Sequence, residues 1–342
     1  MTENQFISEF ETALKRLPAE ERNDIIQDIK EYFTNGREDG KSESEIAASL
    51  GSPEKIADEL LASYSFEENV VEMIATNEVI TIQDNRFANV DINVQHGALF
   101  VSPSDSSVTT VELMGSNDKL QLTAEVVGDT LFVRLKSLRH WLFMFNFTMK
   151  AVTVNVCIPK KLYESLVMKT DNGRISAEKI LCKKIRAKTD NGKIQLREIA
   201  ATTLTAETDN GRIEISKVQA DHLRTKTDNG RIEMRYVDAV SIATETDNGR
   251  IVLERVSGSI VGSTDNGRII VQTDSIDQNM DLRTDNGNIL IESNVRAENV
   301  TIHAKTSHSR IDVFGERNLR TVIGAGEHTI RLKTDNGRIT VK

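Results

Sequence analysis

Apolar residues in the carboxy-terminal half of the chain recur at constant positions of a repeated unit of about 19 residues. The tetrapeptide T-D-N-G begins at Thr170, Thr189, Thr208, Thr227, Thr246, Thr264, Thr284 and Thr334, and a degenerate T-S-H-S begins at Thr306. Counted from each Thr, apolar residues follow at +5, +7, +10 and +15, as in Ile213, Ile215, Val218 and Leu223. A unit this small cannot bury an apolar face alone, so the units must stack. The pattern predicts a parallel β-solenoid, of the β-helix or β-roll type, over residues 169–342.

A β-meander of hairpins is the alternative architecture, because Asn-Gly is also typical of a type I′ hairpin turn. The near-constant period favours the solenoid, since stacked coils need the same inward positions in every unit. In the turn, glycine is expected to supply a positive φ angle that asparagine also tolerates. The Asp or Thr side chains are expected to bind the turn amides.

Stacking of the turns predicts two parallel rows of charged side chains. The acidic row consists of Asp171, Asp190, Asp209, Asp228, Asp247, Asp265, Asp285 and Asp335. The basic row consists of Arg174, Lys193, Arg212, Arg231, Arg250, Arg268 and Arg338, and Asn288 interrupts it. Because like charges about 5 Å apart repel, the basic row is expected to offset the acidic row.

The alternative interpretation of these rows is a binding edge. The Asp row would bind a cation, or the Arg row an anionic polymer or a protein. The G-G-x-G-x-D pattern of calcium-binding β-rolls does not occur, which argues against calcium.

Residues 78–168 have the alternation and the β-branched residues of strands. The predicted strands are 79–82, 90–94, 98–101, 108–113, 120–126, 131–135 and 152–158. They are expected to form antiparallel pairs that cap the first coil.

One stretch of this segment has aromatic residues at every second position: Trp141, Phe143, Phe145 and Phe147. This spacing places all four side chains on one face of a strand. The alternatives are a capping strand buried on both faces, a dimer or partner surface, and contact with a membrane surface.

Residues 1–66 predict four short helices, and residues 67–77 a linker. Thr2 with Gln5 and Ser42 with Glu45 form capping boxes, Pro18 suits the first turn of the second helix, and Ser52-Pro53 begins the fourth. Phe6, Phe10, Leu14, Ile29, Phe33, Ile46 and Ile56 lie on the apolar stripes.

The negative charge of the chain is concentrated in this helical segment. Residues 1–68 hold 7 Lys+Arg and 17 Asp+Glu, a net charge of −10, and the rest of the chain has a net charge of +1. The fourth helix carries Glu54, Asp58 and Glu59 where a DNA-reading helix needs cations. The pattern indicates a protein partner and excludes direct nucleic-acid binding by this segment.

The order of an F-x-x-x-L first helix, Glu31-Tyr32-Phe33 and L-G-S-P-E-K-I-A-D-E-L from Leu50 to Leu60 resembles the HAAS family of helical signalling domains. The resemblance covers nearly all of residues 1–66. It implies a regulatory role in bacteria of the Bacillus type, often alongside a PadR-like transcription regulator. Domains of this family usually precede membrane helices, whereas a β region follows here.

The V-x-V-x-V-x-I-P segment from Val152 to Pro159, followed by K-T-D-N-G-R-I, is similar to the putative-adhesin β-repeat family of unknown function. This resemblance extends from about residue 78 to residue 342. The family often accompanies cell-envelope stress genes, and the adhesin label implies export.

No catalytic or cofactor signature occurs in the sequence. There is no G-x-S-x-G, P-loop or G-x-G-x-x-G motif, and the six histidines show no ligand spacing. The two cysteines, Cys157 and Cys182, are unpaired in spacing and indicate free thiols. We expect no enzyme activity, no cofactor and no metal.

The acidic amino terminus and the lack of a long apolar run predict a cytoplasmic protein without a membrane span. The leading hypothesis is a regulatory interaction scaffold with a protein partner, which a PadR-like regulator would fit. The alternatives are an exported adhesin that binds an envelope polymer and, less favoured, a carbohydrate-active enzyme. Oligomers are expected through the aromatic strand or the solenoid end.

Overall fold

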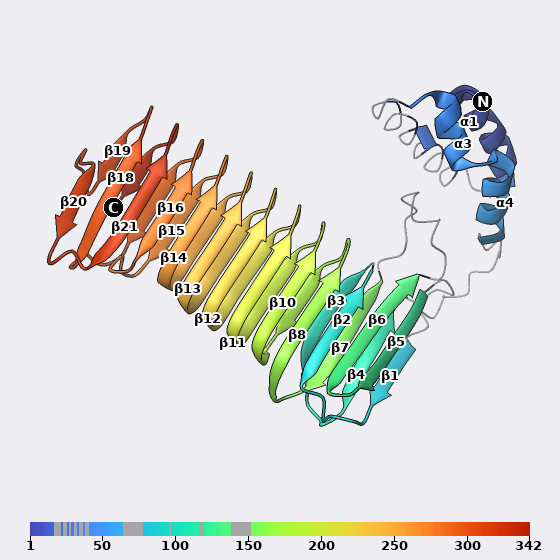
Figure 1. Ribbon diagram of the computed structural model, residues 1–342, viewed down its shortest axis with the longest axis horizontal. Coiled ribbons are helices and arrows are strands. Elements are labelled where there is room, and N and C mark those ends of the chain that lie inside the picture. Colours follow the sequence, from blue (N-terminus) through green and yellow to red (C-terminus); the bar gives the residue numbers. More distant parts are fainter. Residues whose placement is uncertain are drawn as a thin grey trace. The chain divides into compact units, whose positions relative to one another are not determined.

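The computed structural model describes residues 1–16, 22, 26, 29–30, 33, 37, 41–63, 78–95, 97–115, 120–137 and 152–342. The chain divides into a helical unit and a β unit (Figure 1), and each is described by itself. The predicted α+β class, a small helical domain followed by a parallel β-solenoid, is confirmed.

The described helices of the helical unit begin where the capping residues predict. The elements are α1 (Glu3–Ala13), η1 (Leu14–Arg16), α3 (Glu43–Leu50) and α4 (Pro53–Ser63). Both predicted capping boxes, Thr2 with Gln5 and Ser42 with Glu45, are formed. Each box satisfies backbone N–H groups that the first helical turn leaves without a partner.

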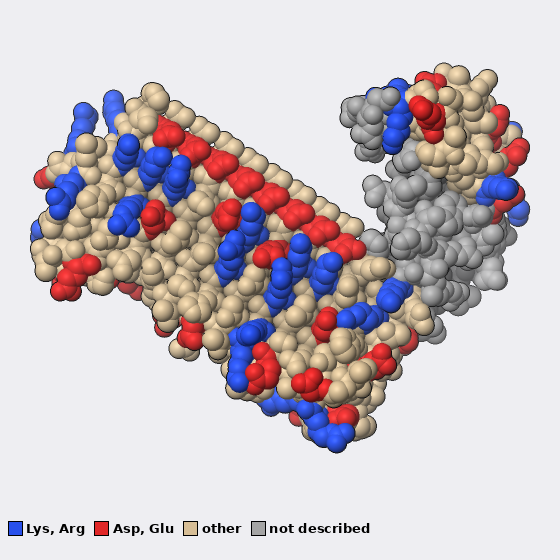
Figure 2. Space-filling view, viewed as in Figure 1, with Lys and Arg blue, Asp and Glu red and all other residues tan. Residues whose placement is uncertain are grey.

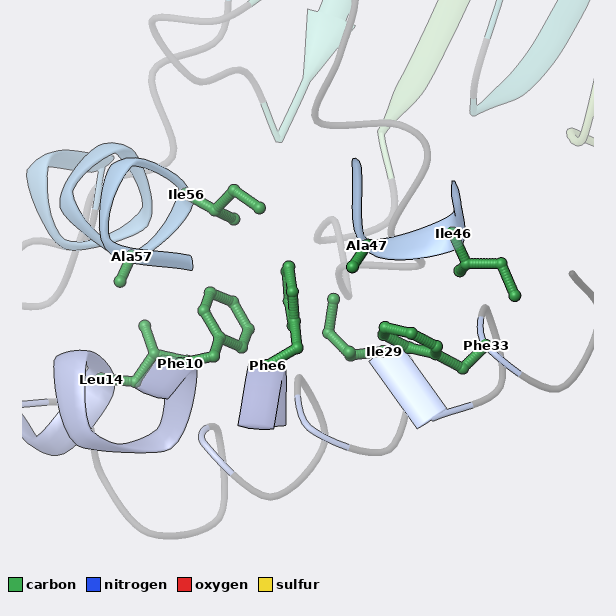
Figure 3. Close-up of a cluster of buried hydrophobic side chains, with 9 residues drawn as sticks. All are labelled: Phe6, Phe10, Leu14, Ile29, Phe33, Ile46, Ala47, Ile56 and Ala57. Atoms are coloured by element: carbon green, nitrogen blue, oxygen red, sulfur yellow. The ribbon is translucent and has the colours of Figure 1, made fainter. Parts of the chain in front are cut away.

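The core of the helical unit is a cluster of buried apolar side chains (Figure 3). Its members are Phe6, Phe10, Leu14, Ile29, Phe33, Ile46, Ala47, Ile56 and Ala57. The ring of Phe6 lies 6.0 Å from that of Phe10 and 5.7 Å from that of Phe33, centroid to centroid. Ile29 and Phe33 belong to the predicted second helix, most of which lies outside the described residues.

The strands that precede the array match the seven predicted strands to within about three residues. They are β1 (Glu78–Ile82), β2 (Asn89–Val94), β3 (Ala98–Ser104), β4 (Thr109–Met114), β5 (Leu120–Val127), β6 (Thr130–Ser137) and β7 (Thr153–Pro159).

The strands of the array, β8 to β22, form the coils that the T-D-N-G turns connect. They are β8 (Leu162–Thr170), β9 (Ile175–Glu178), β10 (Leu181–Thr189), β11 (Ile194–Thr208), β12 (Ile213–Thr227), β13 (Ile232–Thr246), β14 (Ile251–Thr264), β15 (Ile269–Thr273), β16 (Met280–Thr284), β17 (Ile289–Ser293), β18 (Val300–Thr306), β19 (Ile311–Val313), β20 (Arg320–Ile323), β21 (His328–Thr334) and β22 (Ile339–Val341).

Neighbouring coils pair in parallel, residue for residue, one repeat apart. Ile213 of β12 pairs with Ile194 of β11 and with Ile232 of β13. The predicted inward residues Ile213, Ile215, Val218 and Leu223 are all buried. Parallel pairing of this kind excludes the β-meander.

Each coil has two faces that meet at a residue with positive φ. β9 pairs with the first part of β11 and β10 with the second part. The residue between these parts, Glu198, has a φ of 55°. Its equivalents are Lys179, Lys217, Tyr236 and Arg255, at φ values from 51° to 55°.

The amino-terminal end of the stack does not follow chain order. β2 and β3 pair in parallel with β8 and β9 on one side and with β6 and β7 on the other. The expected antiparallel caps are present, as β5 on β6 and as β4 on β7 with β1 outside β4. The segment before the array therefore supplies coils as well as caps, which differs from the expectation of caps alone.

The carboxy-terminal end is also out of order. β21 and β22, the last strands of the chain, lie between β16–β17 and β18–β19 (Figure 1). β20 then pairs antiparallel with β18. After β17 the chain forms the terminal coil from β18 and β19, with β20 paired to its outer side. β21 and β22 then lie between this coil and the coil of β16 and β17. The additional strand β20 accounts for the longest repeat spacing, between Thr306 and Thr334.

Replacing Phe6 with Ala is expected to unfold the helical unit and leave the β unit folded. A Phe-to-Ala change in a core costs about 3–5 kcal/mol, comparable with the whole stability of a small domain. Circular dichroism at 222 nm during urea titration should lose the helical transition. Thr12→Ala, at an exposed position of α1, is the control. Retention of a helical transition at its original midpoint in Phe6→Ala would contradict the described core.

Candidate functional site

The T-D-N-G turns stack into one continuous edge of the solenoid, and a buried threonine forms the base of each turn. Thr189 is fully buried. Its hydroxyl accepts a hydrogen bond from Gly192 N–H at 3.1 Å and donates one to the carbonyl of Gly173, in the preceding coil, at 3.1 Å. One side chain thus closes its own turn and joins it to the turn of the preceding coil.

The turn glycine is required by the distance between coils. A Cβ built on Gly192 would lie 1.7 Å from the carbonyl oxygen of Gly173, and every later turn glycine has the same conflict. None of these glycines has a positive φ. The expectation of a positive φ in the turn was therefore wrong: in the five coils that begin at Thr170, Thr189, Thr208, Thr227 and Thr246, the left-handed residue is the ninth after the Thr, as at Glu198.

The turn asparagines form a hydrogen-bonded ladder along the edge. Asn191 Nδ2 donates to Asn172 Oδ1 at 2.6 Å, and Asn210 donates to Asn191 at 2.8 Å. The ladder continues through Asn229, Asn248, Asn266, Asn286 and Asn336. Each amide uses its donor toward one coil and its acceptor toward the other, so the row stabilises the stack.

The predicted acidic row is continuous on the surface, where Figure 2 shows it as a line of acidic residues along the edge. The backbone of each Asp takes part in the coil ladder: Asp190 N–H and Asn191 N–H both donate to the carbonyl of Asp171, at 3.0 and 3.1 Å. Within the described ranges, no ion pair joins a carboxylate of this row to a Lys or Arg. The Asp residues of the row are half-buried or exposed.

The basic row forms its ion pairs with glutamates instead. Lys193 lies 2.7 Å and Arg212 3.5 Å from Glu214. Arg231 lies 2.6 Å from Glu233. The expectation that the basic row offsets the Asp row was therefore wrong for these cations. Arg212 and Arg231 each pair with the Glu two positions further along the chain, and Lys193 pairs with Glu214 of the next coil.

Glu214 illustrates the electrostatics beside the turn edge. Burial acts to raise the pKa of its carboxyl, but the hydrogen bonds and charges of Lys193 and Arg212 outweigh burial and leave the pKa below its ordinary value. A carboxyl with a lowered pKa stabilises the fold above its unfolded pKa and loses that contribution as the pH falls through the folded pKa.

The degenerate T-S-H-S turn stands at the physical end of the stack. Ser307 N–H and His308 N–H donate to the carbonyl of Asp335, at 3.2 and 3.0 Å, so the backbone ladder is preserved. His308 takes the position of the asparagine where the ladder ends. The departure from the motif therefore falls in the terminal coil.

Sequence reasoning missed a further turn position of the stack, between β2 and β3 and next to the first T-D-N-G turn. Val94 pairs with Thr170, and Asp171 N–H donates to the carbonyl of Gln95. A Cβ on Gly173 would lie 1.5 Å from the carbonyl oxygen of Gly97. The sequence carried a sign of this turn: in Gly97-Ala98-Leu99 an apolar residue follows a glycine by two positions, as in the Gly-Arg-Ile of later turns.

The predicted aromatic interaction residues Trp141, Phe143, Phe145 and Phe147 lie outside the described residues. The strands that flank them are described. β6 ends and β7 begins at the edge where later coils carry the T-D-N-G turn. The role of these aromatic residues stays a prediction.

The described residues contain no group of three or more His, Cys, Asp or Glu side chains able to hold a metal ion. No helix in the described part of the chain is long and apolar enough to cross a membrane. Of the two cysteines, Cys182 is buried and burial raises the pKa of its thiol to about 11.

Two known protein families match this chain, one over the coils and one over the helices. The model of the family described as Toastrack DUF4097 matches residues 87–342, which include all the coils. The chain belongs to the Toastrack DUF4097 family. The HAAS model matches residues 5–59, so a HAAS domain precedes the Toastrack domain. Among curated proteins, none matches the chain.

Several solved structures are similar to the Toastrack domain. A putative adhesin from Parabacteroides merdae is 15% identical, with 75% of this chain and 96% of that chain covered and a TM-score of 0.47. A putative adhesin from Bacteroides fragilis is 14% identical, with 78% and 97% covered and a TM-score of 0.42. A putative lipid binding protein from Parabacteroides distasonis is 14% identical, with 75% and 97% covered and a TM-score of 0.46.

Replacing Gly230 with Ala should destabilise the Toastrack domain by more than about 3 kcal/mol, the range of severe core changes. The added Cβ would lie 1.7 Å from the carbonyl oxygen of Gly211, so the two coils would have to separate. The midpoint of urea unfolding measures the effect. Asp228→Ala, in the same turn, is the control and should change the free energy of unfolding by about 0.5 kcal/mol or less. Equal shifts in the two variants would contradict the close approach of the coils.

Replacing Glu214 with Gln should lower stability at neutral pH by about 0.5 kcal/mol and remove part of the loss of stability on acidification. Because the carboxyl stabilises the fold only when it is ionised, variant and parent should become equally stable at pH values below its folded pKa. Urea unfolding at a series of pH values measures this. Glu125→Gln, at an exposed position of β5, should keep the pH profile of the parent. A constant difference between Glu214→Gln and parent at every pH would refute the ion-pair account.

Proposed function

We propose that this chain is a non-enzymatic bacterial scaffold, in which the HAAS domain docks a protein partner and the Toastrack solenoid is a rigid support. The observation that carries this proposal is the uniform turn edge. The same Thr, Gly and Asn contacts recur in each turn and have a structural cause. Enzymes built on β-helices instead use irregular loops that gather catalytic groups.

The acidic charge of the HAAS domain supports a basic protein partner. Residues 1–68 have a net charge of −10. A shallow hollow of about 310 Å³ lies between α1 and α4, lined by Ser8, Glu9, Thr12, Ala13 and Glu54. Glu9 and Glu54 are exposed at this hollow. Two carboxylates from different helices suit a Lys or Arg side chain of a partner.

The proposed partner is a transcription regulator of the PadR-like type, and the proposed location is the cytoplasm, where such a regulator acts. The support is the HAAS domain together with its charge. The net negative charge of residues 1–68 repels the phosphate backbone of DNA. The HAAS domain would therefore act on the regulator and not on its DNA.

Charge reversal at the hollow tests the docking role. The double variant Glu9→Lys/Glu54→Lys should bind a purified PadR-like regulator from the same organism at least tenfold more weakly, since about 1.4 kcal/mol corresponds to tenfold in affinity. Isothermal titration calorimetry with the full chain gives the dissociation constants.

The matched control is Glu11→Lys/Asp58→Lys, which reverses two exposed carboxylates on the same helices. These residues do not line the hollow. The control should retain most of the affinity. Equal weakening in both variants would show a diffuse charge effect, and no binding by the parent would remove the PadR-like partner from the proposal.

A further inference from the structure

A cluster of cationic side chains lies on the outer surface of the solenoid at its carboxy-terminal end. We define the basic end patch as Arg283 of β16, Arg331 and Lys333 of β21, His303 and Lys305 of β18, and Arg320 of β20. Asp281 is the single carboxylate among the described residues that line the associated hollow. Figure 2 shows Lys and Arg side chains gathered at this end of the visible face.

Strand register places these cations directly beside one another. Arg283 pairs with Lys333, and Lys333 pairs with Lys305. In the second row, Asp281 pairs with Arg331, Arg331 with His303, and His303 with Arg320. All except Lys333, which is half-buried, are exposed. All of them except Arg320 line an open hollow of about 610 Å³.

The same rows in the middle of the solenoid are neutralised coil by coil. Arg186 lies 3.0 Å from Glu207, Lys226 lies 3.2 Å from Glu245, and Arg224 lies 3.9 Å from Glu245. Within the described ranges, no ion pair involves Arg283, Lys305, Arg320, Arg331 or Lys333. The ion pairs between neighbouring coils on this face therefore stop where the patch begins.

This arrangement is unfavourable for the protein alone. Like charges directly opposite one another on neighbouring strands destabilise a sheet. The coil order produces the cluster, since β21 returns from the end of the chain to bring Lys333 between Arg283 and Lys305. A ligand with several negative charges would remove the repulsion.

We propose that the basic end patch binds a linear acidic glycan with one carboxylate on each sugar. The chain would lie along the solenoid axis across β16, β21 and β18. Neighbouring strands lie about 4.8 Å apart, close to the length of one sugar residue in a linear polysaccharide. Each strand thus meets one sugar, and Arg283, Lys333 and Lys305 each meet one carboxylate.

Other polyanions fit the patch less well. Single-stranded nucleic acids bind through stacking on aromatic side chains, and the described lining of the hollow has no Phe, Tyr or Trp. Duplex DNA is bound by domains with a large positive charge, whereas the chain beyond residue 68 has a net charge of +1. An acidic peptide that adds a strand needs a sheet edge, whereas Arg283 and Lys333 lie on β16 and β21, which are paired with a strand on both sides.

The test uses the full-length protein and polygalacturonate oligomers of defined length, with the dissociation constant measured at low and at physiological salt. The triple variant Arg283→Gln/Lys305→Gln/Lys333→Gln should bind about tenfold more weakly or worse. Asp281→Asn should bind more tightly, because it removes the carboxylate that repels the ligand. Because the triple variant also removes like-charge repulsion, its melting temperature should equal or exceed that of the parent, which shows that it folds.

The matched control is Arg186→Gln/Arg224→Gln/Lys226→Gln, which removes the same charge from the middle of the same face and should keep the affinity of the parent. Equal loss in both triple variants, or no loss in the patch variant, would overturn the site. Tighter binding of inorganic polyphosphate or duplex DNA than of the uronate oligomer, lost in the patch variant, would overturn the glycan assignment.

Discussion

The stack depends on the contact between the turn glycine of one coil and the carbonyl of the turn glycine in the coil before it. No side chain fits between them, since a Cβ would lie 1.7 Å from that oxygen at Gly192, Gly211 and Gly230. The buried threonine hydroxyl holds this contact by bonding to both coils. Because a strand slip by one residue would turn the inward face outward, the contact also keeps Ile, Leu and Val side chains in the core.

The rows of exposed side chains follow from that contact. The Asn ladder, the Asp row and the cations that pair with glutamates all repeat because their coils are in register. Regularity of this kind is a property of stacking and identifies no binding site. Two regions differ chemically from the repeated coils: the HAAS domain, and the carboxy-terminal end of the solenoid. At that end the ion pairs between Lys or Arg of one coil and Glu of the next no longer occur among the described residues.

Sequence periodicity predicted the solenoid, its inward residues and the capped helices, because each depends on local spacing. It placed Ile213 and Val218 in the core and Thr2 and Ser42 at helix starts. It failed where contacts join distant residues. The glycine was assigned a torsional role because a single sequence does not show the neighbouring coil, and the Arg row was paired with the wrong carboxylates for the same reason.

The order of coils was the main feature that the sequence did not reveal. Repeat spacing shows where a coil begins but not which coil it pairs with, so Lys333 gave no sign of lying between Arg283 and Lys305. The same holds for the connection between β2 and β3, whose place beside the first T-D-N-G turn is established by the pairing of β2 with β8. The basic end patch is thus a product of topology.

Disulfide formation between engineered cysteines tests this order most directly. In a background without Cys157 and Cys182, Leu290→Cys/Thr340→Cys should oxidise readily, because residues 290 and 340 are register partners on β17 and β22. Parallel neighbours have Cα atoms about 5 Å apart, within the range of a disulfide. Leu290→Cys/Asp312→Cys should stay reduced, since β22 separates these positions. Oxidation of the second pair and not the first would show that the coils follow chain order and would contradict the account.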